Sequence, residues 1–365
     1  MRYTIRNYEI RLKKRIEKPP HIKYGIPIAA LAASVIIAMI VMESIGTSSV
    51  AAMFTLVNRI LSLSGMAEMI VRMIPLLLAG LAVYIPMRAG LWNIGAGAGI
   101  YGGGITAAAI GIYAPLPGPL LIVAILFGSA IVGGLLLFIP GYLRARWDIN
   151  EILTSLLLTF GMIQLNEYAI LLMPAEDVTH SSASLQAGAV FPRIAGTRIH
   201  LGVALAILAF ILVYIMMNRS KFGYEIKMFG SNPTAASQAG ISKYKVIIGT
   251  FVIGGILSGL AGGAEVAGIH GRLVPEFSPG YGFTAIAIAL IGMRGEFKVL
   301  AATFLFAAVY IGVASIELTH AVPFALVDVF EAVVILFFVA GEAIRQFQLD
   351  VKSLNDVDDT EGVPA

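Results

Sequence analysis

The sequence contains no cysteine, and only 13% of its 365 residues are charged. The missing cysteine excludes disulfides, thiolate metal sites and cysteine nucleophiles. The sequence also lacks a paired-histidine zinc motif, a Gly-x-Ser-x-Gly nucleophile elbow and a Gly-x-x-x-x-Gly-Lys-Ser/Thr phosphate loop. We therefore expect a protein that is not an enzyme, uses no cofactor or metal, and leaves any ATP hydrolysis to a separate subunit.

Apolar residues dominate what is present. They make up 58% of the chain, and the mean hydropathy is +0.87. Ordinary soluble domains carry about 25% charged residues, roughly twice the fraction found here. Several apolar runs are long enough to cross the roughly 30 Å of hydrocarbon as helices, and they do not alternate as barrel strands would. The composition predicts an all-α polytopic, multi-pass membrane protein, and we expect its location to be the cell (plasma) membrane.

The apolar runs predict about ten transmembrane helices. We place them at 25–43, 67–87, 95–113, 118–139, 151–172, 200–217, 246–268, 280–293, 298–316 and 322–344. The segment 280–293 is short, so it is either a full span or a half-helix lining a cavity. Residues 44–66 are amphipathic enough to form an interfacial helix instead of a loop.

Basic residues fix the orientation of this arrangement. Twenty of the 25 lysines and arginines fall on one side of the predicted spans and four on the other, which makes the first side cytoplasmic. Both termini are then cytoplasmic, with a basic tail at 1–24 and an acidic tail at 346–365 around a transmembrane domain at 25–345. A signal peptide also has a basic and then an apolar region, but the run from 25 to 42 is long for one and lacks a clear cleavage site.

An outer loop at 173–199 divides the spans into two sets of five, which is compatible with an inverted repeat of two five-helix halves. Glycines at four-residue spacing recur in both halves, and such faces let helices approach closely in lipid. We interpret them as packing positions in preference to substrate contacts. They are Gly95, Gly99 and Gly103 in the first half and Gly255, Gly259 and Gly263 in the second.

A polar cytoplasmic loop at 218–245 contains the pattern of a short helix. Asn232 is placed as its N-cap, Pro233 as its first residue and Gly240 as its left-handed terminator. Ala235 and Ala236 lie in its body. A helix of about two turns is marginal alone in water, so we expect it to lean on its own membrane helices or on a soluble partner.

Ionisable residues inside the spans are few, which argues against a relay of protons or sodium ions. Glu68 and Arg72 are four residues apart, and we interpret them as a self-neutralising pair. Asp148 and Glu151 read as a capping box at the start of the fifth span.

Other polar and aromatic residues are candidates for lining the path of a solute. Each has an alternative interpretation as an interfacial anchor or a packed core residue. The candidates are Trp92, Asn93, Asn166, Glu265, Tyr281 and Phe283.

Three stretches of the chain resemble a known family, the membrane permeases of ABC importers for simple sugars and nucleosides, which are related to the branched-chain amino acid and ribose permeases. The stretches are Gly90-Leu-Trp-Asn-Ile-Gly95, Phe229-Gly-Ser-Asn-Pro-Thr-Ala-Ala-Ser-Gln-Ala-Gly-Ile241 and Gly280-Tyr-Gly-Phe-Thr-Ala-Ile-Ala-Ile-Ala-Leu-Ile-Gly292. With Asn150-Glu-Ile152 and Ser258-Gly-Leu-Ala-Gly262, the similarity extends over about residues 65–340. In one place the chain departs from the family, because Ala96-Gly-Ala-Gly99 replaces the usual Ala-Glu-Gly-Gln.

The resemblance implies a permease subunit that moves a small polar solute, a simple sugar or a nucleoside, by alternating access. It implies cytoplasmic ABC ATPase subunits, a second permease subunit that is identical or paralogous, and an extracytoplasmic substrate-binding protein; we expect no nucleic-acid partner. The helix after Asn232 would then be the coupling helix seated on the ATPase. An ion-coupled secondary transporter is the alternative, since it would also have an inverted ten-span structure.

Overall fold

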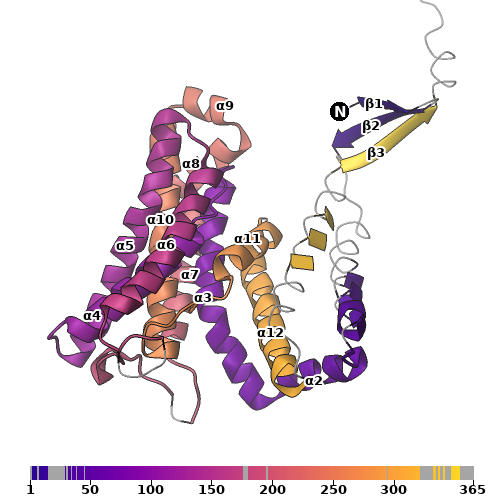
Figure 1. Cartoon of the computed structure of the whole chain (residues 1–365). Helices are drawn as coiled ribbons and strands as arrows, with labels where there is room; N and C mark the ends of the chain where they lie inside the picture. Colours follow the sequence, from indigo (N-terminus) through magenta and orange to yellow (C-terminus); the bar gives the residue numbers. More distant parts are fainter. Residues whose placement is uncertain are drawn as a thin grey trace, which may run out of the picture. The chain divides into compact units, whose positions relative to one another are not determined.

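The computed structural model divides the chain into two units (Figure 1), residues 54–322 and residues 1–53 with 323–365. It describes residues 46–320 apart from 176–179, 195 and 294, the segments 2–5, 8–14 and 347–353, and scattered helical positions within 29–44 and 332–341. The predicted span 322–344 therefore lies mostly outside the described residues, and the span 25–43 lies partly outside them.

Helices make up almost all of the regular structure between residues 46 and 320. They are α2 (Ser49–Leu61), α3 (Leu63–Arg88), α4 (Ala96–Tyr113), α5 (Gly118–Trp147), α6 (Glu151–Leu172), α7 (Gly202–Arg219), α8 (Lys221–Ser231), α9 (Pro233–Gln238), α10 (Lys243–Glu265), α11 (Tyr281–Gly292) and α12 (Glu296–His320). A short 3₁₀ turn (Ala187–Ala189) lies in the loop before α7, and a π-helical turn (Val266–His270) extends α10.

Six of the described helices are long and apolar enough to cross a membrane: α3, α5, α6, α7, α10 with its π turn, and α12. The helix α4 has 18 residues and coincides with a predicted span, but its sequence is rich in glycine. The helix α11 has 12 residues, or a length of about 18 Å, which is too short to cross the hydrocarbon. Of the two interpretations of 280–293, the half-helix is the one that fits. The amphipathic segment after residue 44 also contains a helix, α2.

The terminal segments contain strands that the sequence analysis did not predict. β1 (Arg2–Ile5), β2 (Tyr8–Lys14) and β3 (Phe347–Ser353) form an antiparallel sheet in the order β1-β2-β3. β2 pairs with β3 from Tyr8 opposite Ser353 to Lys14 opposite Phe347. The expectation of an all-α protein is thus confirmed for the helical unit and corrected for the tails, where chain segments far apart in sequence pair their backbones.

Two helices form the centre of the helical unit. In the apolar 18-residue segment of α3, 83% of the residues are buried, and in that of α10 with its π turn 67% are buried. The corresponding share is 33% or less in α5, α6 and α7. Because lipid is as apolar as a protein core, the outward faces of α5 to α7 can remain hydrophobic. Among the site residues described below, Arg72 lies on α3 and Glu265 on α10, whereas Asn166 lies on α6 and Tyr281 on α11.

Glycines of the two predicted halves pack against each other at this centre. A Cβ at Gly99 of α4 would clash with Ser258 of α10, and one at Gly103 would clash with the backbone carbonyl of Gly259. On the other face of α10, a Cβ at Gly255 would clash with the carbonyl of Gly133 in α5. The remaining predicted packing positions are also crowded, with Gly95 against Leu137 and Ser155 and Gly263 against Ser129. The glycines therefore allow α4, α5 and α10 to approach backbone to backbone.

Candidate docking helix and transport path

The short helix after Asn232 has the local structure that its sequence predicts. The Asn232 side chain accepts a hydrogen bond from the backbone N–H of Ala235 at 3.0 Å and caps α9, with Pro233 at its first position. Gly240 has a φ of +81°, and its N–H donates to the carbonyl of Ser237 at 3.1 Å. Both ends of α9 are thus capped within the loop itself, which compensates for a length of only six residues.

The exposed and buried faces of α9 differ. Ala236 is fully buried, whereas Ala235 and the residues around it are exposed. Of the two alanines predicted to dock, only Ala235 can touch another protein directly. Ala236 instead holds α9 on its own bundle.

The preceding helix, α8, is fixed to the start of α10 by charge. Glu225 is 7% exposed, and its carboxylate lies 3.0 Å from Nζ of Lys245 and 3.9 Å from Nζ of Lys221. The N-terminus of α8 is capped by Ser220, which accepts from the N–H of Gly223 at 3.0 Å. The helix α8, which connects α7 to α9, is therefore held in place by a charged contact to α10 and by its N-terminal cap.

The end of α8 touches the end of α3. A Cβ at Gly230 would clash with the backbone carbonyl of Arg88, the last residue of α3. Arg88 in turn donates from Nη1 to the carbonyl of Met293 at 2.7 Å, in the turn between α11 and α12. One turn earlier in α3, the Tyr84 hydroxyl donates to Glu296 of α12 at 3.0 Å. α9, α8, α3 and the α11–α12 turn thus form one chain of direct contacts.

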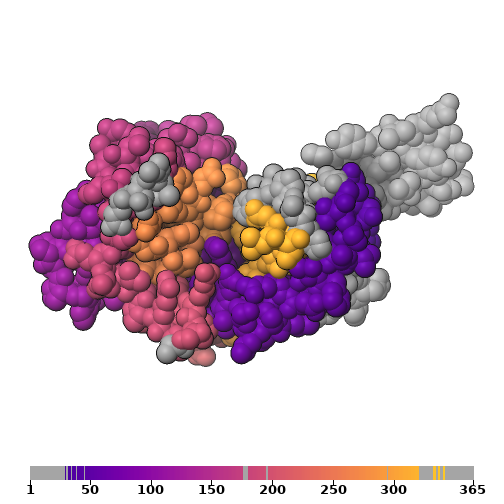
Figure 2. Space-filling view, turned by 60° about the horizontal axis from the view of Figure 1, so that its bottom comes forward, coloured from indigo at the N-terminus to yellow at the C-terminus, as the bar shows by residue number. Residues whose placement is uncertain are grey.

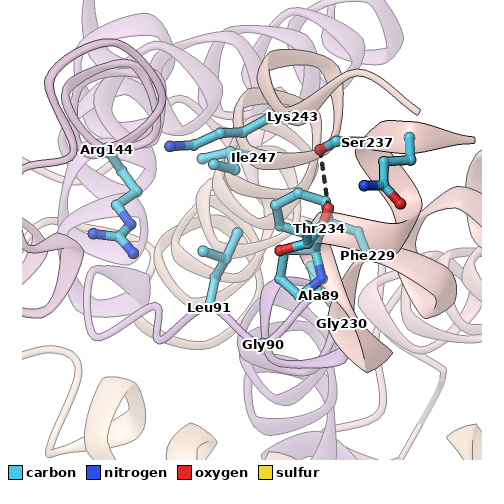
Figure 3. A pocket seen from close by; sticks show the side chains of 12 residues that line it. Ala89, Gly90, Leu91, Arg144, Phe229, Gly230, Thr234, Ser237, Lys243 and Ile247 are labelled. Carbon is cyan, nitrogen blue, oxygen red and sulfur yellow. Dashed lines mark hydrogen bonds between the residues drawn. The ribbon is translucent and has the colours of Figure 1, made fainter. Parts of the chain in front are cut away.

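A pocket of about 710 Å³ lies beside α9 (Figure 3). Residues of α9 line one side, and Arg144 of α5 and Lys243 of α10 approach from the other. Both basic side chains bind Asp148, whose Oδ1 lies 3.3 Å from Nη1 of Arg144 and 3.2 Å from Nζ of Lys243. The hydrogen bond from Lys243, and then the charge of Arg144, lower the pKa of Asp148. The pocket therefore has a fixed, paired set of charges at its wall.

The predicted capping box between α5 and α6 is wrong. The N-cap of α6 is Asn150, whose side chain accepts from the N–H groups of Ile152 and Leu153. Asp148 instead ends α5 with a φ of 56°, and Glu151 lies 3.2 Å from Nε of Arg144. Both carboxylates pair with Arg144, which lies near the end of α5 and is not part of the capping-box pattern.

The two amides among the path candidates hydrogen-bond to backbone. Asn93 is 1% exposed; its Nδ2 donates to the carbonyl of Ala82 at 3.2 Å, and its Oδ1 accepts from Gly95 at 2.9 Å. Asn166 is fully buried and donates to the carbonyl of Val274 at 3.3 Å, while its Oδ1 has no hydrogen-bond partner among the residues that the structure describes. Asn93 therefore joins the α3–α4 link to α3, and Asn166 keeps an acceptor that no described residue uses.

The aromatic candidates separate into exposed and buried residues. Trp92 and Phe283 are 42% and 43% exposed, although each lies close in sequence to a buried candidate, Asn93 and Tyr281 respectively. Tyr281, the first residue of α11, is fully buried and packs edge-on against Tyr310 with ring centroids 5.6 Å apart. Tyr281 is thus the one aromatic candidate that the fold places at the centre of the helical unit.

Glu265 and Tyr281 both contact Arg72, which the sequence analysis paired with Glu68. Glu265 is fully buried, and its Oε1 lies 3.4 Å from Nη1 of Arg72, 3.5 Å from the Tyr281 hydroxyl and 3.3 Å from Nε2 of His270. Arg72 also donates to the Tyr281 hydroxyl. The polar cluster joins α3, α10 and α11 at the π turn, a feature that often marks functional positions.

The predicted pairing of Glu68 with Arg72 is accordingly wrong. Glu68 instead accepts hydrogen bonds from Arg59 and from Arg198 of the loop before α7. Arg198, together with Arg193 and His270, lies near this cluster but was not among the candidate site residues. Arg193 and Arg198 could not be assigned to the cluster from the sequence, because these loop residues, about 75 positions from the π turn, approach it only through tertiary structure.

Known proteins similar to this chain are membrane permeases. A family model described as branched-chain amino acid transport system / permease component matches residues 65–339. A glucose ABC transporter permease protein of Haloferax volcanii is 36% identical and is aligned over 94% of both chains. A guanosine ABC transporter permease protein of Bacillus subtilis is 33% identical over 76% of this chain and 82% of its own. A nucleoside ABC transporter permease protein of Lactococcus lactis is 27% identical over 90% of this chain and 93% of its own.

Proposed function

Because the chain belongs to the family of branched-chain amino acid transport system permease components, we propose that it forms the path by which a simple sugar or a nucleoside crosses the membrane. It is a multi-pass membrane protein and the permease subunit of an ABC importer. The relatives named for glucose, guanosine and other nucleosides support the class of solute. Two cytoplasmic ATPases, a second permease subunit and an external binding protein complete the importer.

The observation that carries the coupling role is the structure of α9. It is a short helix with both ends capped, and it carries small exposed side chains around Ala235. A helix with such side chains can enter a groove on another protein without steric conflict. In this proposal α9 is the coupling helix, its end of the bundle is cytoplasmic, and both chain termini are cytoplasmic as well.

The contact chain behind α9 supports coupling to the transport path. A displacement of α9 would move α8. Because Gly230 has no Cβ, the end of α8 contacts the backbone carbonyl of Arg88 at the end of α3 directly. α3 continues into the Gly90–Gly95 link and also holds the α11–α12 turn through Arg88. Closure of the ATPases would therefore shift α3 and α11, which is the rigid-body type of change that alternating access requires.

The helices support a path between two repeats. Eight of the ten predicted segments coincide with described helices, namely the six long apolar helices, α4 and the half-helix α11. In this proposal the predicted spans 25–43 and 322–344 complete the ten. The glycine helices α4 and α10 come from opposite halves and pack at the centre. We propose that these halves form an inverted repeat and that Glu265, Tyr281 and Asn166 line the path beside them.

The test is an Ala235→Glu variant in the complete importer. It should reduce solute uptake and permease-dependent ATPase stimulation at least about tenfold, since a buried unpaired carboxylate at an interface costs several kcal/mol. The matched control is Ala175→Glu, at an exposed alanine after α6, and should behave as wild type. Normal stimulation with Ala235→Glu would refute docking through α9. Uptake that survives ATP depletion but collapses with an ion gradient would favour the ion-coupled alternative.

A further inference from the structure

A second pocket, of about 330 Å³, lies at the end of the helical unit opposite α9. Figure 2 brings this end forward, where the loop before α7 lies against the end of α10 and the segment that follows it. The residues that line the pocket include Glu68 and Arg72 of α3, Arg193 and Arg198 of the loop, and His270 of the π turn. Three separate elements therefore meet around one cavity.

Positive charge exceeds negative charge around this pocket. Within the part of the chain that the structure describes, four guanidinium groups and two carboxylates form the pocket and its ion pairs. The excess of two positive charges favours an anionic ligand. The arginines are Arg59, Arg72, Arg193 and Arg198, and the carboxylates are Glu68 and Glu265.

Arg193 is the arginine with the most hydrogen-bond donors available to a ligand. Its Nη2 contacts the backbone carbonyl of Gly268 at 3.4 Å. No carboxylate lies within ion-pair distance of Arg193 among the described residues, whereas Arg72 and Arg198 each have one. A guanidinium group carries five N–H donors in a planar fork, which matches two oxygens of a phosphate at once. Arg193 can therefore bind an oxyanion without giving up a charged partner.

The pocket lies near one end of the predicted spans. Arg72 is five residues inside the end of the span 67–87, which corresponds to about 7.5 Å along the helix. A long arginine side chain at that depth can extend its charged group to the membrane interface. Arg193 and Arg198 belong to the loop between two spans and start outside the hydrocarbon. An anion in the pocket would thus lie at the level of the lipid phosphates.

An exposed apolar stripe along α7 begins beside the pocket. Only 28% of the apolar segment of α7 is buried, the lowest share among the six long apolar helices that the structure describes. Leu201, three residues after Arg198, is 40% exposed, and further exposed residues follow at helical spacing on the same face. Acyl chains could lie along this face while their phosphate binds in the pocket. The stripe consists of Leu201, Leu208, Leu212 and Ile215.

We propose that this pocket binds the phosphate group of an anionic lipid and that Arg193 and Arg198 are its main ligands. Free phosphate has the same oxyanion chemistry, but it has no chains to cover the stripe on α7. A zwitterionic lipid would bring its own cation close to the excess arginine charge, so an anionic headgroup should be preferred. The bound lipid would join the loop before α7 to Arg72 of α3. This site goes beyond the proposed transport function and does not depend on the transported solute.

The experiment is native mass spectrometry of the full-length permease in detergent, titrated with phosphatidylglycerol or with phosphatidylcholine. The wild type should bind phosphatidylglycerol about tenfold or more tightly than phosphatidylcholine, and equal affinities would overturn the proposal. Arg193→Gln should weaken phosphatidylglycerol binding about tenfold through the loss of a bidentate charged contact. Arg193→Lys should give a smaller loss because it keeps the charge without the planar fork.

Arg272→Gln is the matched control. Arg272 lies in the same end region but donates to Ser184 and does not line the pocket, so its variant should bind phosphatidylglycerol as the wild type does. Equal lipid binding by Arg193→Gln and Arg272→Gln variants of unchanged thermal stability would overturn the site. Inorganic phosphate at millimolar concentration separates the two sources of the anion. It should leave phosphatidylglycerol bound, and displacement of the lipid by phosphate would overturn the lipid as the ligand.

Discussion

Arg72 and Glu265 stand 193 positions apart in the sequence, and their Nη1 and Oε1 atoms lie 3.4 Å apart in the structure. The pair connects α3, at the start of the helical unit, with the end of α10. Glu265 is fully buried, so its charge has no access to water and needs this partner. The Tyr281 hydroxyl and His270 complete the shell around it. Like the hydrogen bond from Tyr84 to Glu296, this cluster joins elements of the two predicted halves through polar side chains.

Breaking the pair from one side should destabilise the permease more than removing both charges. Arg72→Gln leaves the buried Glu265 carboxylate without its guanidinium, which costs about 3–5 kcal/mol for a buried pair. Arg72→Gln together with Glu265→Gln leaves two neutral amides that can hydrogen-bond. Thermal unfolding of the purified permease should therefore show a lower midpoint for Arg72→Gln than for the double variant. A double variant less stable than both single variants would contradict the pairing.

Two glycine-to-alanine substitutions should affect stability differently, because one glycine lies where α10 packs closely against α5 and the other does not. Gly259→Ala should destabilise the helical unit by about 1–3 kcal/mol, because its Cβ would clash with the backbone carbonyl of Ser129. Gly161→Ala, in α6, meets no atom within 4 Å and should be neutral or stabilising by up to about 1 kcal/mol. Melting temperatures of the two variants measure the difference. Equal effects would mean that α10 does not pack backbone to backbone against α5.

Because His200, in the loop before α7, is buried, the permease should become less stable in acid. Burial lowers its pKa to about 4, and its Nδ1 accepts a hydrogen bond from the N–H of Gly202 at 3.1 Å, which requires the neutral ring. In the unfolded chain His200 has its ordinary pKa of 6.5 and takes up a proton that the folded protein does not. The free energy of unfolding therefore falls as the pH is lowered from about 6.5 to 4.

The measurement is the melting temperature of the permease at pH 7 and at pH 5. The wild type should lose several degrees more than His200→Gln, since the variant has no proton to take up. The control, His180→Gln, changes an exposed histidine and should follow the wild type. If the wild type and His200→Gln lose the same number of degrees, the buried neutral histidine is not the cause.

Features determined by neighbouring residues could be predicted from the sequence. The cap at Asn232, the proline at 233 and the left-handed Gly240 are all read within one short loop, and α9 has each of them. The span boundaries follow apolar runs, so most predicted spans agree with helices to within a few residues. The short segment 280–293 left two interpretations open, and its length in the structure decided between them.

Features determined by tertiary contacts could not be predicted in this way. The four-residue spacing of Glu68 and Arg72 indicated a local pair, but longer-range partners, Glu265 and Arg198, bind them instead. In the same way Arg144 draws Glu151 away from a capping role, and Asn150 caps α6. Charged side chains are long enough to choose among several neighbours, and sequence spacing alone does not rank those neighbours.

The most direct test of coupling uses the absence of cysteine from the chain. Ala235→Cys places one thiol on the exposed face of α9, and Ala175→Cys places one at an exposed position after α6 as the control. A short bifunctional cross-linker is applied to the assembled importer, followed by mass spectrometry of the product. The account predicts a covalent product between the ATPase and the Ala235→Cys permease and none with Ala175→Cys. An ATPase product with Ala175→Cys but not with Ala235→Cys would contradict it.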